Sequence, residues 1–257
     1  MRKDEELDHI WFIADTHFLH EKIFEFFPAR IQQALEDSIG KDFVNHDQWL
    51  INRINSKVGK KDTIYFLGDV SLGSKIKTEA LLDTIDGRKI LIAGNHDKNL
   101  LHSTRFQEIK QIKNFTFNSE NIPNLHIVLC HYPISVWERK EHNSLHLHGH
   151  THGRSSALHK EIVNNINSWD VGVDVNNYYP ISLKEVLEKL KYKHIQKIKE
   201  NELIKQINKN TPIKLNLVGK NGYGEFKDKF KFCEFTEKLD TKCFIEANNL
   251  KSESKKV

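Results

Sequence analysis

The chain has 257 residues, of which 38% are hydrophobic and 29% are charged, and its formal net charge is +4. This composition argues against a disordered protein, and the length allows one large domain or one domain with a small appendage. The first ten residues are charged and no apolar run approaches the roughly 20 residues of a membrane helix, so a cytoplasmic location is expected.

The expected elements alternate between strands and helices. Five short segments rich in Ile, Leu, Val and aromatic residues are expected to be buried strands: Ile10–Ala14, Thr63–Leu67, Lys89–Ala93, Leu125–Cys130 and Leu145–His148. Helices are expected at Asn45–Val58, capped by Asn45, and at Lys75–Ile85, ending before Gly87. This alternation indicates an α/β fold. From Lys110 onward strands and loops prevail, which predicts antiparallel or mixed pairing there.

The C-terminal part is Lys-rich. Ser182 and Glu185 form a capping-box pattern at the start of a helix expected to reach about Asn208, with strand-like segments such as Ile213–Val218 after it. From Lys184 to the end there are 18 Lys against 11 Asp and Glu. Such a region can contact nucleic acid through its phosphates, although a solvated helix face with interleaved Glu is the commoner case.

Cysteine and histidine usage points to a metal rather than to disulfides. Cys130, Cys233 and Cys243 are an odd number without close pair spacing, so neither a disulfide framework nor a zinc ribbon is expected. Fifteen histidines are present, and several lie between His142 and His159. In an enzyme, such crowding suggests a metal site first.

Residues of metal-ligand type follow each of the five expected strands. They are Asp15 and His17; Asp69; Asn95, His96 and Asp97; His131; and His150 and His152. The carboxyl ends of strands in α/β sheets are where sites assemble, so these residues are expected to meet. Carboxylates, imidazoles and an amide oxygen suit Mn, Fe, Zn or similar ions. Two such ions can clamp a phosphoryl group and make a bridging water nucleophilic at neutral pH.

In order along the chain, the sequence resembles the motifs of calcineurin-like metallophosphoesterases at Asp15-x-His17, Gly68-Asp69, Gly94-Asn95-His96-Asp97, His131 and Gly149-His150-x-His152. The likeness spans about Ile10 to Leu187 and is greatest to small bacterial and phage members of that superfamily. It implies a four-layer α/β/β/α sandwich with two central mixed sheets over residues 8–192. Residues 193–257 then form a Lys-rich C-terminal extension of unknown role.

The resemblance also implies a role for each matching residue. Asp15, His17 and His152 hold one metal ion, Asn95, His131 and His150 hold a second, and Asp69 bridges the two. His96 protonates the leaving oxygen or stabilises the charged transition state, and Asp97 orients His96. The two ions are expected to be Mn, with Fe, Zn, Ni or Mg as alternatives.

Three residues near these motifs are candidates for substrate contacts: His20, Arg88 and Arg154. Each has an ordinary surface position as its alternative. His146 and His148 alternate with leucines and are expected to pack in the core.

The expected function is hydrolysis of phosphate monoesters or diesters, with nucleotides as one substrate class. A nuclease acting on DNA or RNA ends is the second hypothesis, which the basic C-terminal region mildly favours. A non-catalytic scaffold with the same fold is the third. It ranks last because every ligand position and His96 are filled.

Overall fold

The computed structural model describes residues 4–40, 42, 45–119, 122, 124–154, 167–191, 217–219 and 222–224. The chain divides into two compact units, Met1–Ile198 and Lys199–Val257. Within the second unit the described residues form one antiparallel pair, β10 (Leu217–Gly219) and β11 (Gly222–Gly224). Most of the expected Lys-rich helix lies outside the described residues.

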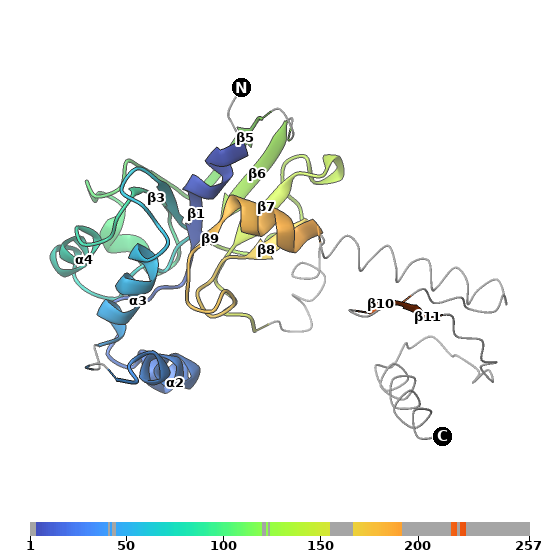
Figure 1. The fold of residues 1–257 in the computed structure, drawn as a ribbon. Coiled ribbons are helices and arrows are strands. Elements are labelled where there is room, and N and C mark those ends of the chain that lie inside the picture. Colours follow the sequence, from blue (N-terminus) through green and yellow to red (C-terminus); the bar gives the residue numbers. More distant parts are fainter. Residues whose placement is uncertain are drawn as a thin grey trace, which may run out of the picture. The chain divides into compact units, whose positions relative to one another are not determined.

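The first sheet has five strands in the order β4-β3-β2-β1-β9. Strands β3, β1 and β9 of this sheet are labelled in Figure 1. They are β4 (Glu108–Lys110), β3 (Arg88–Ile92), β2 (Thr63–Phe66), β1 (Ile10–Ile13) and β9 (Ile181–Ser182). Strands β1 to β4 are parallel, and β9 pairs with β1 in the antiparallel sense. The register aligns Ile13 with Phe66 and Phe66 with Leu91. The segments that follow β1, β2 and β3 therefore leave the sheet at the same edge.

The second sheet has four strands in the order β5-β6-β7-β8. They are β5 (Ile112–Phe117), β6 (Leu125–Cys130), β7 (Leu145–His148) and β8 (Ser168–Asp170). The pair β5–β6 is antiparallel, whereas β6–β7 and β7–β8 are parallel. This mixed pairing confirms the change predicted after Lys110.

Both of the helices predicted between the early strands are present, and each begins directly after a capping residue. Helix α3 (His46–Asn55) starts after Asn45, whose side chain accepts a hydrogen bond from the Gln48 amide, and α4 (Lys75–Leu82) starts after Ser74. Helices α1 (Ile23–Phe26) and α2 (Pro28–Asp37) precede them. Short 3-10 helices are η1 (Asp4–His9), η2 (Asp97–Leu100) and η3 (Lys140–His142).

The predicted capping box is also present. The Ser182 amide donates to Glu185, and the Glu185 amide donates to the Ser182 hydroxyl, at the start of helical residues 183–191. Among the described helices, none combines the length and the hydropathy that a membrane span requires.

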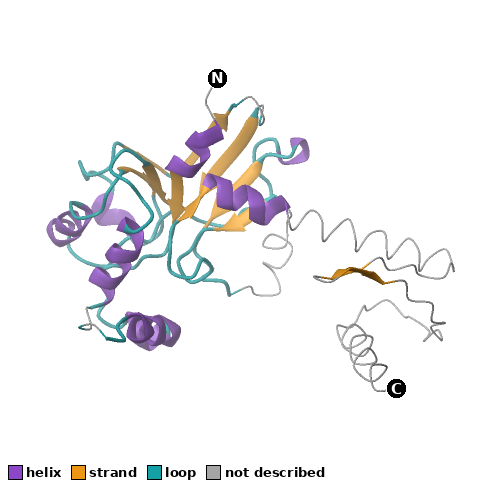
Figure 2. Ribbon diagram, viewed as in Figure 1, coloured by secondary structure: helices purple, strands orange, loops and turns teal. Residues whose placement is uncertain are grey.

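Two hydrophobic clusters define the layers. The first joins one face of the first sheet to α3 and α4 and includes Trp11, Ile13, Phe66, Leu91, Trp49, Leu50, Ile54 and Leu82. The second lies between the sheets and includes Phe12, Tyr65, Ile92, Ile127, Leu129 and Leu147. Successive β1 side chains point to opposite faces, so Trp11 and Phe12 enter different clusters. The described layers are thus helices, first sheet and second sheet (Figure 2), an α/β fold with two mixed sheets.

Candidate metal centre

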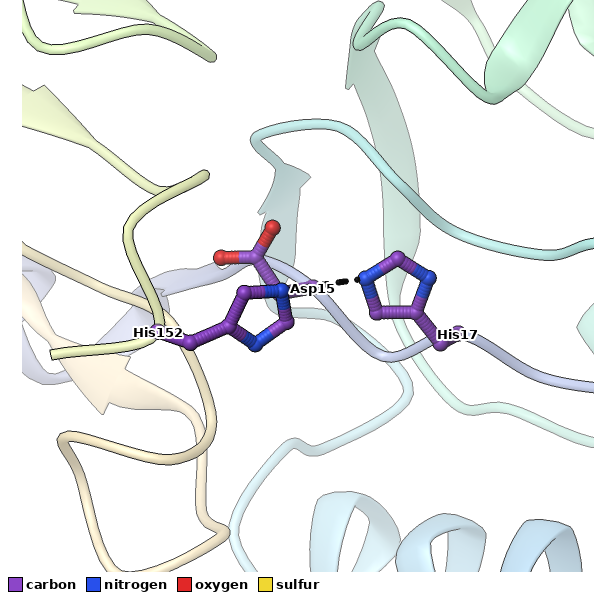
Figure 3. Close-up of side chains that lie close together, drawn as sticks. All are labelled: Asp15, His17 and His152. Carbon is purple, nitrogen blue, oxygen red and sulfur yellow. Dashed lines mark hydrogen bonds between the residues drawn. The ribbon is translucent and has the colours of Figure 1, made fainter. Parts of the chain in front are cut away.

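The first cluster of ligand-type side chains consists of Asp15, His17 and His152, whose ligand atoms all lie within 4.8 Å of one another (Figure 3). Asp15 and His17 follow β1, and His152 follows β7 in the other sheet. The Nε2 atoms of the two histidines are 3.3 Å apart. Two ligand atoms each about 2.1 Å from one ion lie about 3.0–3.4 Å apart at ordinary coordination angles. The two nitrogens therefore have the spacing that a shared ion requires.

The second cluster consists of Asp69, His131 and His150, which follow β2, β6 and β7. His131 Nδ1 donates to the backbone oxygen of Leu67 at 2.8 Å, so its Nε2 is the atom that faces the cluster. That Nε2 atom lies 3.5 Å from Asp69 Oδ2 and 3.3 Å from the side-chain oxygen of Asn95. Asn95 is thus placed beside the second cluster.

Asp69 lies between the two clusters. Its Oδ2 atom is 3.9 Å from Nε2 of His17 and 3.5 Å from Nε2 of His131. Burial raises the pKa of Asp69, but its hydrogen bonds and the neighbouring histidines outweigh burial and lower the pKa to about 2. The carboxylate is therefore ionised at neutral pH, and one of its oxygens faces both clusters.

The backbone at these positions is strained. Five ligand-type residues have positive φ: Asp15 at 58°, His17 at 48°, Asp69 at 54°, His150 at 71° and His152 at 50°. Residues other than glycine rarely adopt this left-handed backbone conformation, and each instance costs on the order of 1 kcal/mol or more. Such residues concentrate at functional sites. Close packing around Asp69 adds to the constraint, since a Cβ at Gly94 would lie 2.4 Å from its Oδ1.

The electrostatics of the first cluster fit a cation. Asp15 is fully buried, and within the described part of the chain its Oδ1 has no hydrogen-bond partner, nor does Nδ1 of His17. Oδ2 of Asp15 accepts from the His150 amide, at 2.9 Å. Burial raises the pKa of Asp15 to about 7. A buried carboxylate is costly unless it is paired or coordinates a metal, so the donor set suits a divalent ion.

Comparisons with known proteins agree with this fold but supply no function. No family model matches the sequence. The chain is 29% identical over 181 residues to the uncharacterised protein MJ1445 of Methanocaldococcus jannaschii, covering 70% of this chain and 89% of that one. It is 27% identical over 178 residues to the gene 66 protein of Mycobacterium phage D29, covering 58% and 80%.

The similar solved structures do not supply a function either. The protein of unknown function AQ665 from Aquifex aeolicus matches with a TM-score of 0.53 and 27% identity, over 70% of this chain and 97% of that chain. Vacuolar protein sorting 29 from Cryptosporidium parvum matches with a TM-score of 0.31 and 13% identity, over 56% and 64%, too weak a likeness to argue from.

The motifs in order along the chain, the two mixed sheets and the two adjacent clusters of Asp and His together point to one superfamily. The protein resembles the calcineurin-like metallophosphoesterases. Further polar side chains lie beside the two candidate clusters.

His96 lies beside the shared carboxylate. Its Nε2 atom is 3.9 Å from Asp69 Oδ2, its ring centroid is 5.7 Å from that of His17, and its side chain is 45% exposed. An imidazole in this position is open to solvent on one side and faces Asp69 and His17 on the other.

The carboxylate of Asp97 is occupied by backbone amides. Its carboxylate accepts hydrogen bonds from the backbone amides of Asp69 at 2.8 Å, Val70 at 2.9 Å and Gly94 at 2.8 Å. None of these three bonds involves the ring of His96, so the orienting role of Asp97 stays a prediction. Asp97 ties the loop after β2 to the loop after β3, and so positions Asp69.

Of the three candidate substrate contacts, His20 and Arg154 lie near the first cluster and Arg88 does not. The ring of His20 is 6.2 Å from that of His17, at the rim of the first cluster. The Arg154 guanidinium lies 4.7 Å over Phe27, whose ring stacks on His152.

Arg88 lies farther from the two clusters than His20 and Arg154 do, and its substrate contact stays a prediction. Arg88 begins β3 and donates to Thr63, which begins β2. It therefore lies at the amino end of β3, and the strand extends about 13 Å from there to the end at which the candidate ligand residues lie. His146 and His148, in contrast, are fully buried in β7, as predicted.

Two residues beside the first cluster were missed from the sequence, the partly buried Asp174 and the buried Arg30. Asp174 accepts from Nδ1 of His152 at 2.7 Å and pairs with Arg30, which is fully buried. A faint signal existed for Asp174, which comes shortly after the very short strand β8. Arg30 carries no sequence signal, because an arginine in a polar helix is ordinarily exposed.

Asp15 gives the metal-free protein a testable pH dependence. Its pKa is about 7 in the folded protein, against 3.8 for an exposed aspartate, so the folded state binds the proton more tightly. The resulting stabilisation is complete below about pH 4 and is lost as the pH rises through 7. In a chelator at pH 8, we expect Asp15→Asn to melt several degrees above wild type, and at pH 4 we expect equal melting.

Asp62→Asn is the matched control for this thermal unfolding experiment. Asp62 is also buried, but it accepts hydrogen bonds from Trp11 at 2.9 Å and from the Gly59 amide at 2.8 Å. This variant should melt below wild type at pH 8. An Asp15→Asn protein that melts with or below wild type at pH 8 would show that Asp15 is not destabilising without metal.

Proposed function

We propose that the protein is a metal-dependent phosphoesterase that hydrolyses phosphate monoesters or diesters. The position of Asp69 carries this proposal. One oxygen of its ionised carboxylate lies within 3.9 Å of a histidine nitrogen from each of two ligand clusters. A carboxylate shared in this way suits a pair of ions better than a single one.

Seven residues would hold the two ions. Asp15, His17 and His152 bind one, Asn95, His131 and His150 bind the other, and Asp69 binds both. Two divalent ions so placed supply Lewis acidity toward a phosphoryl oxygen and lower the pKa of a water. Oxygen and nitrogen ligands without a thiolate favour Mn, with Fe, Zn, Ni or Mg as alternatives.

The remaining residues bind substrate and move a proton. His96, half exposed beside Asp69, would donate a proton to the leaving oxygen or stabilise charge on the phosphoryl group. His20 and Arg154 stand at the rim of the first cluster and would contact the substrate, Arg154 through its positive charge. Asp97 keeps Asp69 in place through backbone amides.

The finer architecture belongs to the same proposal. The helices on the first sheet and the two packed sheets supply three layers of a four-layer α/β/β/α sandwich. Among substrates, nucleotides are one class, and a nuclease is the second candidate because the sequence from Lys184 onward has 18 Lys against 11 Asp and Glu.

Hydrolysis assays test the function directly. Metal-stripped protein should be inactive toward p-nitrophenyl phosphate and bis-p-nitrophenyl phosphate, and added Mn²⁺ should restore turnover of at least one of them. The preferred compound identifies the ester class. Absence of turnover with any metal, despite two bound ions, would instead favour a macromolecular substrate or a scaffold.

A further inference from the structure

We propose that Arg30 is a positioning residue that assembles the first metal cluster. It would do so by holding the backbone at Asp15 and by aligning Asp174, which in turn orients His152. This role rests on the proposed function, because it takes Asp15 and His152 as metal ligands.

Arg30 is fully buried, although a charged guanidinium is ordinarily exposed to solvent. Its side chain is 0% exposed, and an unpaired guanidinium there would be strongly destabilising. Nε and Nη2 donate to the two oxygens of Asp174 at 2.8 and 2.7 Å. Nη2 also donates to the backbone oxygen of Asp15 at 2.8 Å, and Nη1 donates to that of Thr16 at 3.1 Å.

His46 completes the set. Its Nε2 atom lies 3.3 Å from Nη1 of Arg30, and its Nδ1 atom lies 3.0 Å from Asp47. Burial and the neighbouring Arg30 lower the pKa of His46, so the ring is neutral and its Nε2 can accept a hydrogen bond. All five N–H groups of the guanidinium thus have a partner. Only the planar fork of arginine meets these partners together; a lysine has three donors on one atom.

Asp174 carries the effect of Arg30 to a metal ligand. Its Oδ2 atom accepts from Nδ1 of His152 at 2.7 Å while it is bound to Arg30. This hydrogen bond places the proton on Nδ1 and leaves Nε2, the atom 3.3 Å from His17, to act as the ligand. Without Arg30, Asp174 would lose the partner that fixes its position.

Of the two clusters, the hydrogen bonds of Arg30 among the described residues reach only the first. Its two bonds to backbone oxygens hold Asp15 and Thr16, where Asp15 has a φ of 58°. Among the described residues, none of its hydrogen bonds reaches Asp69, Asn95, His131 or His150. A residue that only anchored α2 to the body would affect stability alone, whereas this arrangement should affect one metal ion and not the other.

Binding of Mn²⁺ to the metal-stripped full-length chain, measured by equilibrium dialysis, tests the inference without reference to activity. Wild type should bind two equivalents. Arg30→Lys should bind one of them about 10- to 100-fold more weakly and the other unchanged, as expected when the partner of a metal-bound histidine is disturbed. Circular dichroism and thermal unfolding show whether the variant is folded.

Arg53→Lys is the matched control. Arg53 is also buried, pairs with Asp37 at the end of α2, and donates to the backbone oxygen of Asn177 at 2.8 Å, but has no described bond to a ligand residue. It should melt at a lower temperature and bind both equivalents normally. Arg30→Lys in a His152→Ala background should leave the remaining affinity unchanged, because none of the described hydrogen bonds of Arg30 reaches the second cluster.

A second variant covers the case in which Arg30→Lys does not fold. Asp174→Asn keeps the side-chain volume and leaves the bonds from Arg30 to Asp15 and Thr16, and it should show the same selective loss. Wild-type affinity for both equivalents in the folded variants would overturn the role of Arg30 and leave the proposed function standing. Wild-type protein that binds no Mn²⁺ would overturn both.

Discussion

Asp69→Asn is expected to reduce phosphate-ester hydrolysis to the level of the metal-free protein, a loss of more than about 10³-fold. Asparagine keeps an oxygen that can accept from the His96 amide, as Oδ1 of Asp69 does at 3.0 Å, so the fold should survive. It lacks the charge that one oxygen shared between two cations requires. Bound Mn²⁺ should fall below two equivalents in the same preparation.

Asp62→Asn is the control for this loss as well. Asp62 precedes β2 and Asp69 follows it, so the two aspartates lie at opposite ends of one strand. The control should melt at a lower temperature but keep Mn²⁺-dependent turnover. If Asp69→Asn retained two bound ions and wild-type turnover, the assignment of Asp69 as the shared ligand would be wrong.

His96→Ala is expected to keep both ions and lose about 10²- to 10⁴-fold in turnover. The size of the loss should depend on the leaving group if His96 protonates it. p-Nitrophenolate leaves readily without a proton, so its esters should lose less than an alkyl ester such as glycerol phosphate. Equal losses for both would assign His96 to stabilising charge on the phosphoryl group instead.

The control for His96 is His102→Ala, an exposed histidine shortly after η2. Its kinetics should match wild type for both substrates. Unchanged turnover in His96→Ala with either leaving group would exclude His96 from the chemistry and place the proton donor elsewhere.

The ends of the strands could be predicted because the sequence signal there is local. Buried strands are continuous apolar runs, and all five expected strands are observed within one residue at each end, with Leu125–Cys130 and Leu145–His148 unchanged. Parallel pairing then brings the following polar residues together. The helix starts at Asn45 and Ser182 were equally readable, because capping depends on residues three positions apart.

What was missed depends on contacts distant in sequence. Helix α2 buries only Arg30 and Ala34, so it shows no apolar stripe, and the Asp174 that holds Arg30 is 144 residues away. Arg88 shows how proximity in sequence differs from proximity in space. It is near Asn95 in sequence, but the extended strand β3 runs between the two residues and holds them apart.

Titration of the metal-free protein with Mn²⁺, with hydrolysis rate recorded against equivalents added, tests the paired metal centre most directly. A single shared carboxylate between two complete clusters predicts a rate that rises until two equivalents per chain are bound and then levels off. A rate that reaches its maximum at one equivalent, or that does not depend on metal, would contradict the two-ion site.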